Sequence, residues 1–407
     1  EVRTWGEFLG EAGEEEVGKF VFEKFEWDRP AVVAFTSGTT GKPKGIIHGA
    51  GGMLLQHVKE HQLHLDVRKG DVVFFYTTCG WMMYQWLISA LASGATVVLF
   101  DGAAVAAAPE SPDAPGSLLL SLIPKLKITL FGVSAKYLEL VSKTPPAAAA
   151  PTRNFDLASL RTVCSTGSPL SSVLFHWVYT HLAPHVHLVS MSGGTDILSC
   201  FALGDPTLPV HAGELQTAGL GMSIAVYSPA GEPLGHNAPG ELVCTAPFPS
   251  MPLGFLHDTP DKAAFRAAYF ERFPRVWHHG DLVETRPHPS HGVPGWVFHG
   301  RSDAVLNPGG VRIGTAEIYR GIDSLPWIAD CVAAAQRAAD GADERVVLFV
   351  VLAPGATLDA RAVGEAVARH ATRRHVPAVV AEVREVPRNR AGKVVERAVR
   401  WAVNGAE

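Results

Sequence analysis

The clearest chemical signal in the chain is a run of glycine, hydroxyl and lysine residues over Thr36–Gly45, with the sequence T-S-G-T-T-G-K-P-K-G. Its glycines let backbone N–H groups approach an anion closely, and its Thr and Ser hydroxyls add donors. Lys44 contributes a mobile positive charge that suits a polyphosphate. A Walker A motif is excluded because the Lys-Ser/Thr ending is missing. The run indicates a phosphate-binding loop, although composition alone allows a flexible surface loop equally well.

Further segments carry residues suited to nucleotide chemistry. They are Ser192–Asp196 (S-G-G-T-D), His279–Asp281 (H-G-D), Gly300–Asp303 (G-R-S-D), Gly310–Ile313 (G-V-R-I) and Pro387–Lys393 (P-R-N-R-A-G-K). Taken singly, a Gly-Asp pair is usually a turn and a lysine in a basic loop is usually a solvated side chain. It is the order of these segments along the chain that indicates a common function.

In that order, the phosphate run and the later segments resemble the motifs of adenylate-forming enzymes, the family of acyl-CoA synthetases, peptide-synthetase adenylation domains and luciferases. Stretches 59–64, 76–83, 192–197 and 392–396 are most similar to acetoacetyl-CoA synthetases. The resemblance implies an ATP-dependent acid-thiol ligase that converts acetoacetate to acetoacetyl-AMP and pyrophosphate, then transfers the acyl group to CoA and releases AMP. Two alternatives stay open: another short-chain acyl-CoA synthetase, acting on acetate, propionate or butyrate, or an inactive nucleotide-binding fragment.

The resemblance also implies roles for individual residues in nucleotide binding. The phosphate contacts would come from Thr36, Ser37, Gly38, Thr39, Thr40, Gly41 and Lys44. Thr195 would contact the α-phosphate, and Asp196 would hold Mg²⁺ where the family usually has Glu; the shorter side chain would reach the ion through a water. The alternative role for Asp196 is a loop carboxylate that caps backbone N–H groups.

The remaining implied roles concern the sugar, the base and the reacting groups. Gly167, Ser168 and Pro169 would line the adenine pocket, and Asp281 would accept both ribose hydroxyls with Arg301 supporting it. Lys393 would be the catalytic group, stabilising charge between the acyl carboxylate and the α-phosphate. Arg312 would contact the phosphate in the same conformer.

The acyl and CoA sites complete the set of roles that the resemblance implies. Trp81 and Gly193 would line the acyl pocket, because relatives that activate acetate carry a bulky Trp where Gly193 aligns. Gly310 would let the CoA arm pass close to the backbone, and Asp303 would be a hinge. Acetylation of Lys393 by a regulatory lysine acetyltransferase would remove the charge that its role requires.

Composition and charge narrow the class of protein. The 407 residues include 35 Lys plus Arg and 40 Asp plus Glu, for a formal charge of −5, which argues against nucleic-acid binding. Hydrophobic residues make up 47% of the chain, so a sizeable core is expected. No apolar run reaches the ~18 residues of a membrane span. The scattered cysteines favour a reducing, cytoplasmic setting. The resemblance implies the small-molecule partners acetoacetate, ATP and CoA.

The pattern of apolar residues predicts a layered α/β protein, and the resemblance implies the adenylate-forming enzyme fold. Strands are expected at 31–35, 71–76 and 96–100, a helix at 51–64, and loops at 103–116 and 144–152. Near the end of the chain, strands are expected at 345–352 and 378–386, and helices at 358–375 and 394–403. The resemblance implies that these elements form a layered α/β large domain over 1–301, N-terminally truncated and with a small β-rich subdomain at about 204–300. A mobile α+β C-terminal lid domain over 302–407 would follow it.

A rival interpretation concerns the helix expected at 51–64. His57, Glu60 and His61 fit H-x-x-E-H, the inverted zinc-peptidase pattern, in which two histidines one turn apart bind zinc and the glutamate acts as a base. The pattern is short and no third ligand is marked in the sequence. A pair of histidines on a helix surface is the ordinary alternative.

Overall fold

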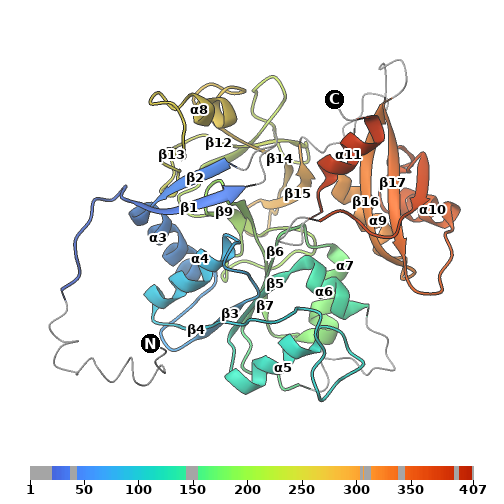
Figure 1. Ribbon diagram of the computed structural model, residues 1–407, viewed down its shortest axis with the longest axis horizontal. Helices are drawn as coiled ribbons and strands as arrows, with labels where there is room; N and C mark the ends of the chain where they lie inside the picture. The colour runs from blue at the N-terminus through green and yellow to red at the C-terminus, as the bar shows by residue number, and fades with distance from the viewer. Residues whose placement is uncertain are drawn as a thin grey trace, which may run out of the picture.

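The computed structural model describes residues 21–36, 44–143, 155–302, 306, 313–337, 344–388 and 394–405. Figure 1 shows a parallel sheet flanked by helices, antiparallel sheets beside it, and a C-terminal unit, orange to red, set to one side. None of the helices in these described ranges combines the length and the apolar character that crossing a bilayer requires.

A five-stranded parallel sheet forms the centre of the first region. In spatial order its strands are β4 (Thr96–Val98), β3 (Val72–Phe75), β5 (Leu130–Ser134), β6 (Thr162–Thr166) and β7 (His187–Ser190). The helices around it are α3 (Ala50–Lys59), α4 (Met83–Ile88), α5 (Ser117–Leu126), α6 (Ala135–Ser142) and α7 (Ser172–Trp177). The inner strands are short apolar runs, as expected where helices cover a parallel sheet.

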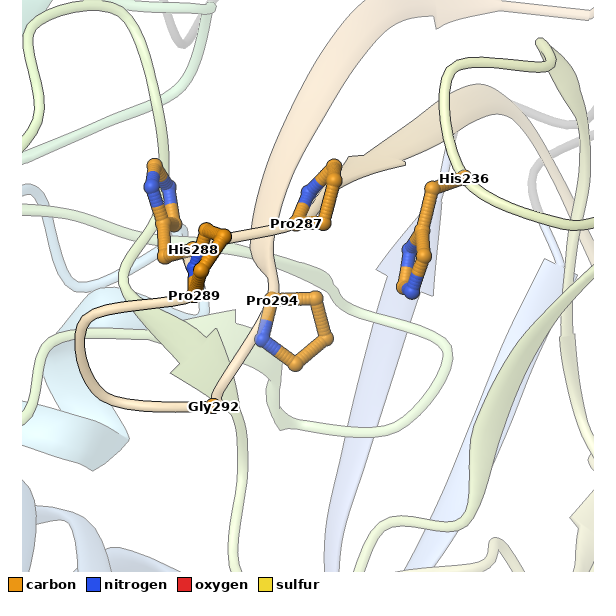
Figure 2. A pocket seen from close by; sticks show the side chains of 6 residues that line it. All are labelled: His236, Pro287, His288, Pro289, Gly292 and Pro294. Carbon is orange, nitrogen blue, oxygen red and sulfur yellow. The ribbon is translucent and has the colours of Figure 1, made fainter.

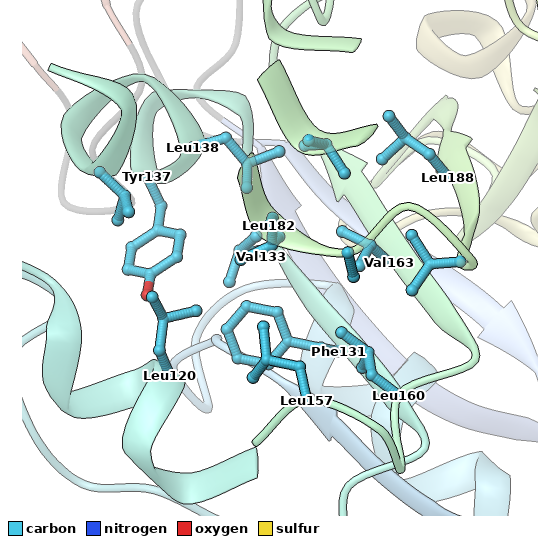
Figure 3. Close-up of a cluster of buried hydrophobic side chains, with 14 of the residues drawn as sticks. Leu120, Phe131, Val133, Tyr137, Leu138, Leu157, Leu160, Val163, Leu182 and Leu188 are labelled. Atoms are coloured by element: carbon cyan, nitrogen blue, oxygen red, sulfur yellow. The ribbon is translucent and has the colours of Figure 1, made fainter. Parts of the chain in front are cut away.

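The main core packs helices α5, α6 and α7 against one face of this sheet (Figure 3). Phe131 on β5 is fully buried and stacks on Phe74 of β3 with 5.4 Å between ring centroids. Tyr137 on α6 brings its hydroxyl into the same core and donates a 2.7 Å hydrogen bond to the Gly116 carbonyl. Burial of the aromatic rings thus fixes the sheet, and with it the loops at its carboxyl edge.

Antiparallel sheets lie next to this core and carry most of the polar motifs. Their strands are β1 (Pro30–Thr36), β2 (Lys44–Gly49) and β13 (Gly254–Phe255); β10 (Thr217–Ala218), β9 (Ser199–Leu203) and β8 (Ser192–Gly194); and β11 (Ile224–Tyr227), β12 (Gly240–Cys244), β14 (Trp277–Arg286) and β15 (Gly295–Arg301). Helix α8 (Ala263–Phe270) packs beside β13 and β14.

The C-terminal unit has its own sheet and its own apolar core. Its elements are α9 (Thr315–Ile322), β16 (Ile328–Arg337), β17 (Glu344–Leu352), α10 (Ala360–His370), β18 (Val379–Glu382) and α11 (Glu396–Asn404). Ile318, Leu348 and Val363 are buried at its centre. Contacts with the rest of the chain include the polar pairs Lys136 Nζ–Asp330 Oδ1, at 3.1 Å, and Lys143 Nζ–Ile328 O, at 3.0 Å.

Most expected elements are present, although several differ in their bounds, as β4 and β18 do by being shorter than expected. The helix expected at 51–64 is regular only to Lys59 and continues as a π-helical turn over Glu60–His64. The helix expected at 358–375 ends at His370, because Ala371 leaves helical geometry and Thr372 caps a separate short turn. Strand β16 was not expected. Segment 103–116 is a loop as predicted, whereas the loop expected at 144–152 lies outside the described residues.

Candidate active site

The two ends of the phosphate run are held by a strand pair. Thr36 ends β1 and lies opposite Lys44, the first residue of β2. The connecting residues Ser37, Gly38, Thr39, Thr40 and Gly41 lie outside the described residues. Lys44 Nζ lies 5.4 Å from the ring centroid of Phe255 on the neighbouring strand β13. The sheet therefore fixes both ends of the run and the position of its second lysine.

Asp196 lies in the turn that leads from β8 to β9. The N–H groups of Ile197 and Leu198 both donate to the Gly194 carbonyl, at 3.2 and 2.9 Å, which closes the turn. The Tyr269 hydroxyl donates a 2.6 Å hydrogen bond to Asp196 Oδ1. Burial and the charge of Asp196 raise the pKa of Tyr269, so its hydroxyl stays protonated and continues to donate.

Two buried histidines border Asp196 from different strands. His48 on β2 is 1% exposed, and burial lowers its pKa to about 4 despite a hydrogen bond to the Thr195 backbone and the charge of Asp196. Burial also lowers the pKa of His279 on β14, against the charges of Asp281 and Asp196. Within the described part of the chain, His48 Nε2 and His279 Nδ1 are buried without a hydrogen-bond partner. Neutral imidazoles thus surround one side of the aspartate.

Asp281 and Arg301 form a cross-strand pair at the end of the β14–β15 ladder. They lie opposite each other in register, and Arg301 Nη1 is 3.3 Å from Asp281 Oδ1. The same Nη1 donates to the His279 carbonyl at 3.0 Å. Gly280 has a φ of +83°, and a Cβ there would lie 2.9 Å from Arg301 Nη2. Glycine at position 280 therefore leaves room for the guanidinium, which holds the carboxylate in place.

The predicted adenine segment follows β6 at the carboxyl edge of the parallel sheet, the edge at which open α/β sheets bind ligands. Gly167 has a φ of +93°, which suits glycine, and Ser168 and Pro169 continue the turn. A Cβ on Gly167 would lie 3.9 Å from the indole edge of Trp81. The structure thus brings Trp81 next to this segment, although the two are 86 positions apart.

Gly193 lies where β8 and β9 approach most closely. A Cβ at this position would lie 1.9 Å from the Ser199 carbonyl oxygen and 2.7 Å from Cys200 Cα. The close approach of the two strands by itself requires glycine here. Its assignment to an acyl pocket stays a prediction that this contact does not support.

A buried polar network holds the start of β9 against the π-helical turn. Glu60 is fully buried and accepts hydrogen bonds from Trp86 Nε1, at 2.8 Å, and from the Ser199 hydroxyl and the Cys200 N–H, at 3.0 Å. Burial opposes ionisation of Glu60, but its pKa is lowered by Lys59, 3.7 Å away, by His57, and by the hydrogen bonds from Ser199 and Cys200. The network therefore fixes the strand that follows Asp196.

The zinc-peptidase interpretation of this region is wrong. His57 Nδ1 lies 2.9 Å from the Ser89 hydroxyl and its Nε2 lies 2.6 Å from the Leu198 carbonyl, so both ring nitrogens have protein partners. His61 packs against Trp86 with ring centroids 4.1 Å apart. Among the described residues, the ligand atoms of His57, Glu60 and His61 do not gather within 4.8 Å of one another. The pattern serves packing and strand positioning instead.

Four further predicted residues lie outside the described part of the chain: Asp303, Gly310, Arg312 and Lys393. The segments that contain the last three are nevertheless anchored at both ends. Leu306 and Ile313 exchange two backbone hydrogen bonds, of 2.9 and 2.7 Å. Arg388 forms an isolated bridge with Val394, and its guanidinium donates to Asp330 at 2.6 Å.

Two residues close to Asp196 were missed by the sequence analysis. Tyr269 lies in the A-A-Y-F stretch of α8, and His48 follows two isoleucines on β2. Neither belongs to a recognisable motif, and both are brought to the site only by the packing of strands and helices distant in sequence. No local signal marks them.

Comparison with known proteins identifies the family. Residues 4–252 match the model of the AMP-binding enzyme family. The chain is 48% identical over 393 residues to an acetoacetyl-coenzyme A synthetase of Rhizobium meliloti (strain 1021), covering 96% of this chain and 58% of that protein. It is 39% identical over 404 residues to an acetoacetyl-CoA synthetase of Gallus gallus, covering 98% and 58%. The chain thus spans little more than half the length of these curated relatives.

Solved structures agree with this comparison. The acetoacetyl-CoA synthetase from Streptomyces lividans superposes with a TM-score of 0.81 at 40% identity, covering 92% of this chain and 55% of that one. An anthranilate CoA ligase in complex with anthranoyl-AMP superposes with a TM-score of 0.77 at 20% identity, covering 93% and 68%, which shows the fold alone. The fold is the adenylate-forming enzyme fold, α/β with mixed sheets. The chain belongs to the family of AMP-binding enzymes.

Proposed function

We propose that this chain activates acetoacetate with ATP, forming acetoacetyl-AMP and pyrophosphate, and transfers the acyl group to CoA. The observation that carries the proposal is the 48% identity to an acetoacetyl-coenzyme A synthetase over 96% of the chain. A carboxylate is a poor electrophile, so its activation depends on positioning the reactants and on neutralising phosphate charge.

The proposed nucleotide site follows the contacts around Asp196 and Asp281. Asp281, oriented by Arg301, accepts hydrogen bonds from the ribose hydroxyls. Thr195 contacts the α-phosphate, and the Thr36–Gly41 segment with Lys44 holds the β and γ phosphates. Gly167, Ser168 and Pro169 contact the adenine, beside Trp81, which we place in the acyl pocket. The 3.9 Å separation between the Gly167 Cβ position and the indole supports adjacent base and acyl sites.

The residues around Asp196 fit a Mg²⁺ ion held together with phosphates. Among the described residues, the one hydrogen bond to its carboxylate is the Tyr269 hydroxyl on Oδ1, which leaves Oδ2 as a ligand. Glycine at position 194 keeps the space beside Oδ2 open, since a Cβ there would lie 3.5 Å from that oxygen. Mg²⁺ commonly takes one or two carboxylates plus phosphate and water oxygens. When bound, the ion would neutralise phosphate charge, while Asp196 holds it in place.

We also propose that residues 302–407 form a lid domain that moves between the two half-reactions. Lys393 and Arg312 reach the α-phosphate for adenylation, and rotation about Asp303 withdraws them and admits the CoA arm past Gly310. Support comes from the separate core of the C-terminal unit and from its polar contacts with the large part, such as Lys136–Asp330. Polar interfaces of this kind are typical of domains that move.

The setting that we propose is the cytoplasm, with small-molecule partners. All five cysteines are free thiols, and Cys164, Cys200 and Cys244 are buried. Burial raises the pKa of each of these three, so they stay protonated and unreactive. Acetylation of Lys393 by a lysine acetyltransferase would switch the adenylation step off, because it removes the positive charge.

The experiment that tests the proposed function is pyrophosphate release from ATP and Mg²⁺ in the presence of single carboxylic acids. Acetoacetate, acetate, propionate and butyrate are compared at equal concentration, with Lys393→Ala as the inactive control. We expect release with acetoacetate at least ~10-fold above the other acids, with about a 100-fold loss or more in the variant, in line with the loss of one group that stabilises transition-state charge. Preferred release with another acid would transfer the proposal to that substrate.

A further inference from the structure

Three histidines gather on the opposite end of the β14–β15 hairpin from Asp281. His211 lies between β9 and β10, and His288 and His291 lie in the loop joining β14 to β15. One ring nitrogen of each lies within 4.8 Å of the other two. Figure 2 shows His288 in this loop beside Pro287 and Pro289. Two chain segments more than 70 residues apart thus converge on one cluster of imidazoles.

The histidine rings of this cluster contain nitrogens that could bind a ligand. His211 and His288 stack at 3.8 Å between centroids with 7° between their planes, and His291 lies 5.1 Å from His288. Within the described residues, His211 Nε2 and His291 Nε2 are buried without a hydrogen-bond partner. Buried polar atoms normally find partners, so two in one cluster call for an explanation. A metal ion that accepts a lone pair from each of these two nitrogens would explain both.

The contacts of the second ring nitrogens of His288 and His291 are compatible with a bound metal ion. His288 Nε2 lies 2.7 Å from Glu214 Oε2 and donates to it, which leaves Nδ1 with its lone pair. The Val293 N–H reaches His291 Nδ1 only at 3.4 Å. Coordination through His291 Nε2 would move the ring proton to Nδ1 and end this long contact at little cost.

Glu214 is placed as the carboxylate that orients a metal-bound histidine. It is 7% exposed, and Arg286 Nη1 lies 3.6 Å from its second oxygen. Gly295 makes room for it, since a Cβ there would lie 1.9 Å from Glu214 Oε2 and 3.0 Å from His288 Nε2. A carboxylate that accepts the second N–H of a ligating histidine is the usual outer support of zinc sites.

We propose that His211, His288 and His291 form a zinc site, with Glu214 as the positioning residue for His288. Three imidazoles with one position open to water match the chemistry of zinc in proteins. Tetrahedral Zn–N bonds of ~2.0–2.1 Å place ligand nitrogens about 3.4 Å apart. Because the rings of His211 and His288 are parallel, they tilt on binding so that their lone pairs converge on one ion. The ion would tie the loop between β14 and β15 to the turn before β10, next to the backbone pair Leu215–Trp296.

The test uses the full chain, purified without a polyhistidine tag and freed of metal by chelation. Zinc chloride is titrated by calorimetry into the wild type, His211→Ala and His291→Gln. We expect one zinc ion per chain with a dissociation constant of ~1 µM or below, at least ~100-fold weaker binding in each variant, and ~10–100-fold weaker binding in Glu214→Gln. Thermal unfolding without metal shows whether each variant is folded, and His291→Gln keeps the test valid if His211→Ala is not.

The matched control is His236→Ala, because His236 lines the neighbouring pocket and bonds to Thr285 instead of joining the cluster. It should bind zinc like the wild type and gain the same zinc-dependent rise in melting temperature. The proposal is overturned if the wild type binds zinc no tighter than ~100 µM, or if the cluster variants bind it as tightly as His236→Ala does. Either result would mean that the three rings only pack against one another.

Discussion

Arg301 lies directly across the strand ladder from Asp281 and reaches its carboxylate at 3.3 Å. The guanidinium also donates to the His279 carbonyl, so it orients the end of β14 as well as the carboxylate. Asp281 is only 9% exposed, so few water molecules compete for its carboxylate. A preorganised acceptor of this kind is what recognition of a ribose diol needs.

Asp281→Asn should weaken binding of ATP. Its amide nitrogen cannot accept a hydrogen bond, and Arg301 loses its charge partner; hydrogen bonds to charged groups contribute ~1.5–3 kcal/mol each. We expect the KM for ATP to rise about 10- to 100-fold while the protein stays folded. Asp113→Asn, in an exposed loop, is the matched control and should leave KM unchanged. An unaltered KM in Asp281→Asn would remove Asp281 from the nucleotide site.

Two neighbouring glycines should respond differently to the same substitution. Gly193→Ala should destabilise the fold by ~2 kcal/mol or more, because its Cβ would overlap the Ser199 carbonyl at 1.9 Å. In Gly194→Ala the nearest atoms are 3.5 Å away, so stability should change by less than ~1 kcal/mol, while space beside Asp196 is lost and adenylation slows. Urea unfolding compares the two. Equal stability would show that β8 and β9 can separate, which would reopen the acyl-pocket role of Gly193.

Glu60→Gln should be strongly destabilising. It leaves Lys59, 9% exposed and 3.7 Å away, without its counter-charge, and breaking a buried pair costs ~3–5 kcal/mol. The double variant Lys59→Met with Glu60→Gln should recover part of the loss, since no uncompensated charge is left. Urea unfolding of the four proteins gives the coupling energy. If the stability losses of the two single variants simply add up in the double variant, Lys59 and Glu60 do not interact, which would contradict the proposed network.

Acid should unfold the protein through its buried histidines. Burial lowers the pKa of His48 to about 4, and burial with the nearby His57 lowers that of His61 to about 3, from 6.5. Since the folded-state values are depressed, the stability that these neutral rings contribute is present above about pH 6.5 and is lost as the pH falls towards 4 and then 3. His61→Leu should lose less stability between pH 7 and pH 4.5 than the wild type.

The control for the acid prediction is His176→Gln, because His176 is exposed on α7. It should follow the wild-type pH profile by urea unfolding. An identical pH profile for His61→Leu and the wild type would show that other groups drive acid unfolding.

The local motifs of the site could be predicted from the sequence, and its tertiary partners could not. The paired ends of the phosphate run at Thr36 and Lys44, and the Asp281–Arg301 pair, come from segments whose own strands bring the residues together. Tyr269 donates to Asp196 from 73 positions away, through packing that no short pattern encodes. The π-helical turn at Glu60–His64 was missed for the same reason, since Glu60 is held by partners on β9.

The measurement that tests the central claim most directly is detection of the adenylate itself. The chain is incubated with ATP, Mg²⁺ and acetoacetate without CoA, and the quenched mixture is examined by mass spectrometry. The account predicts acetoacetyl-AMP in the wild type, none in Lys393→Ala, and its conversion to acetoacetyl-CoA and AMP when CoA is added. Bound ATP with no acyl-adenylate from acetoacetate or any of the other three acids would contradict it and leave a nucleotide-binding protein.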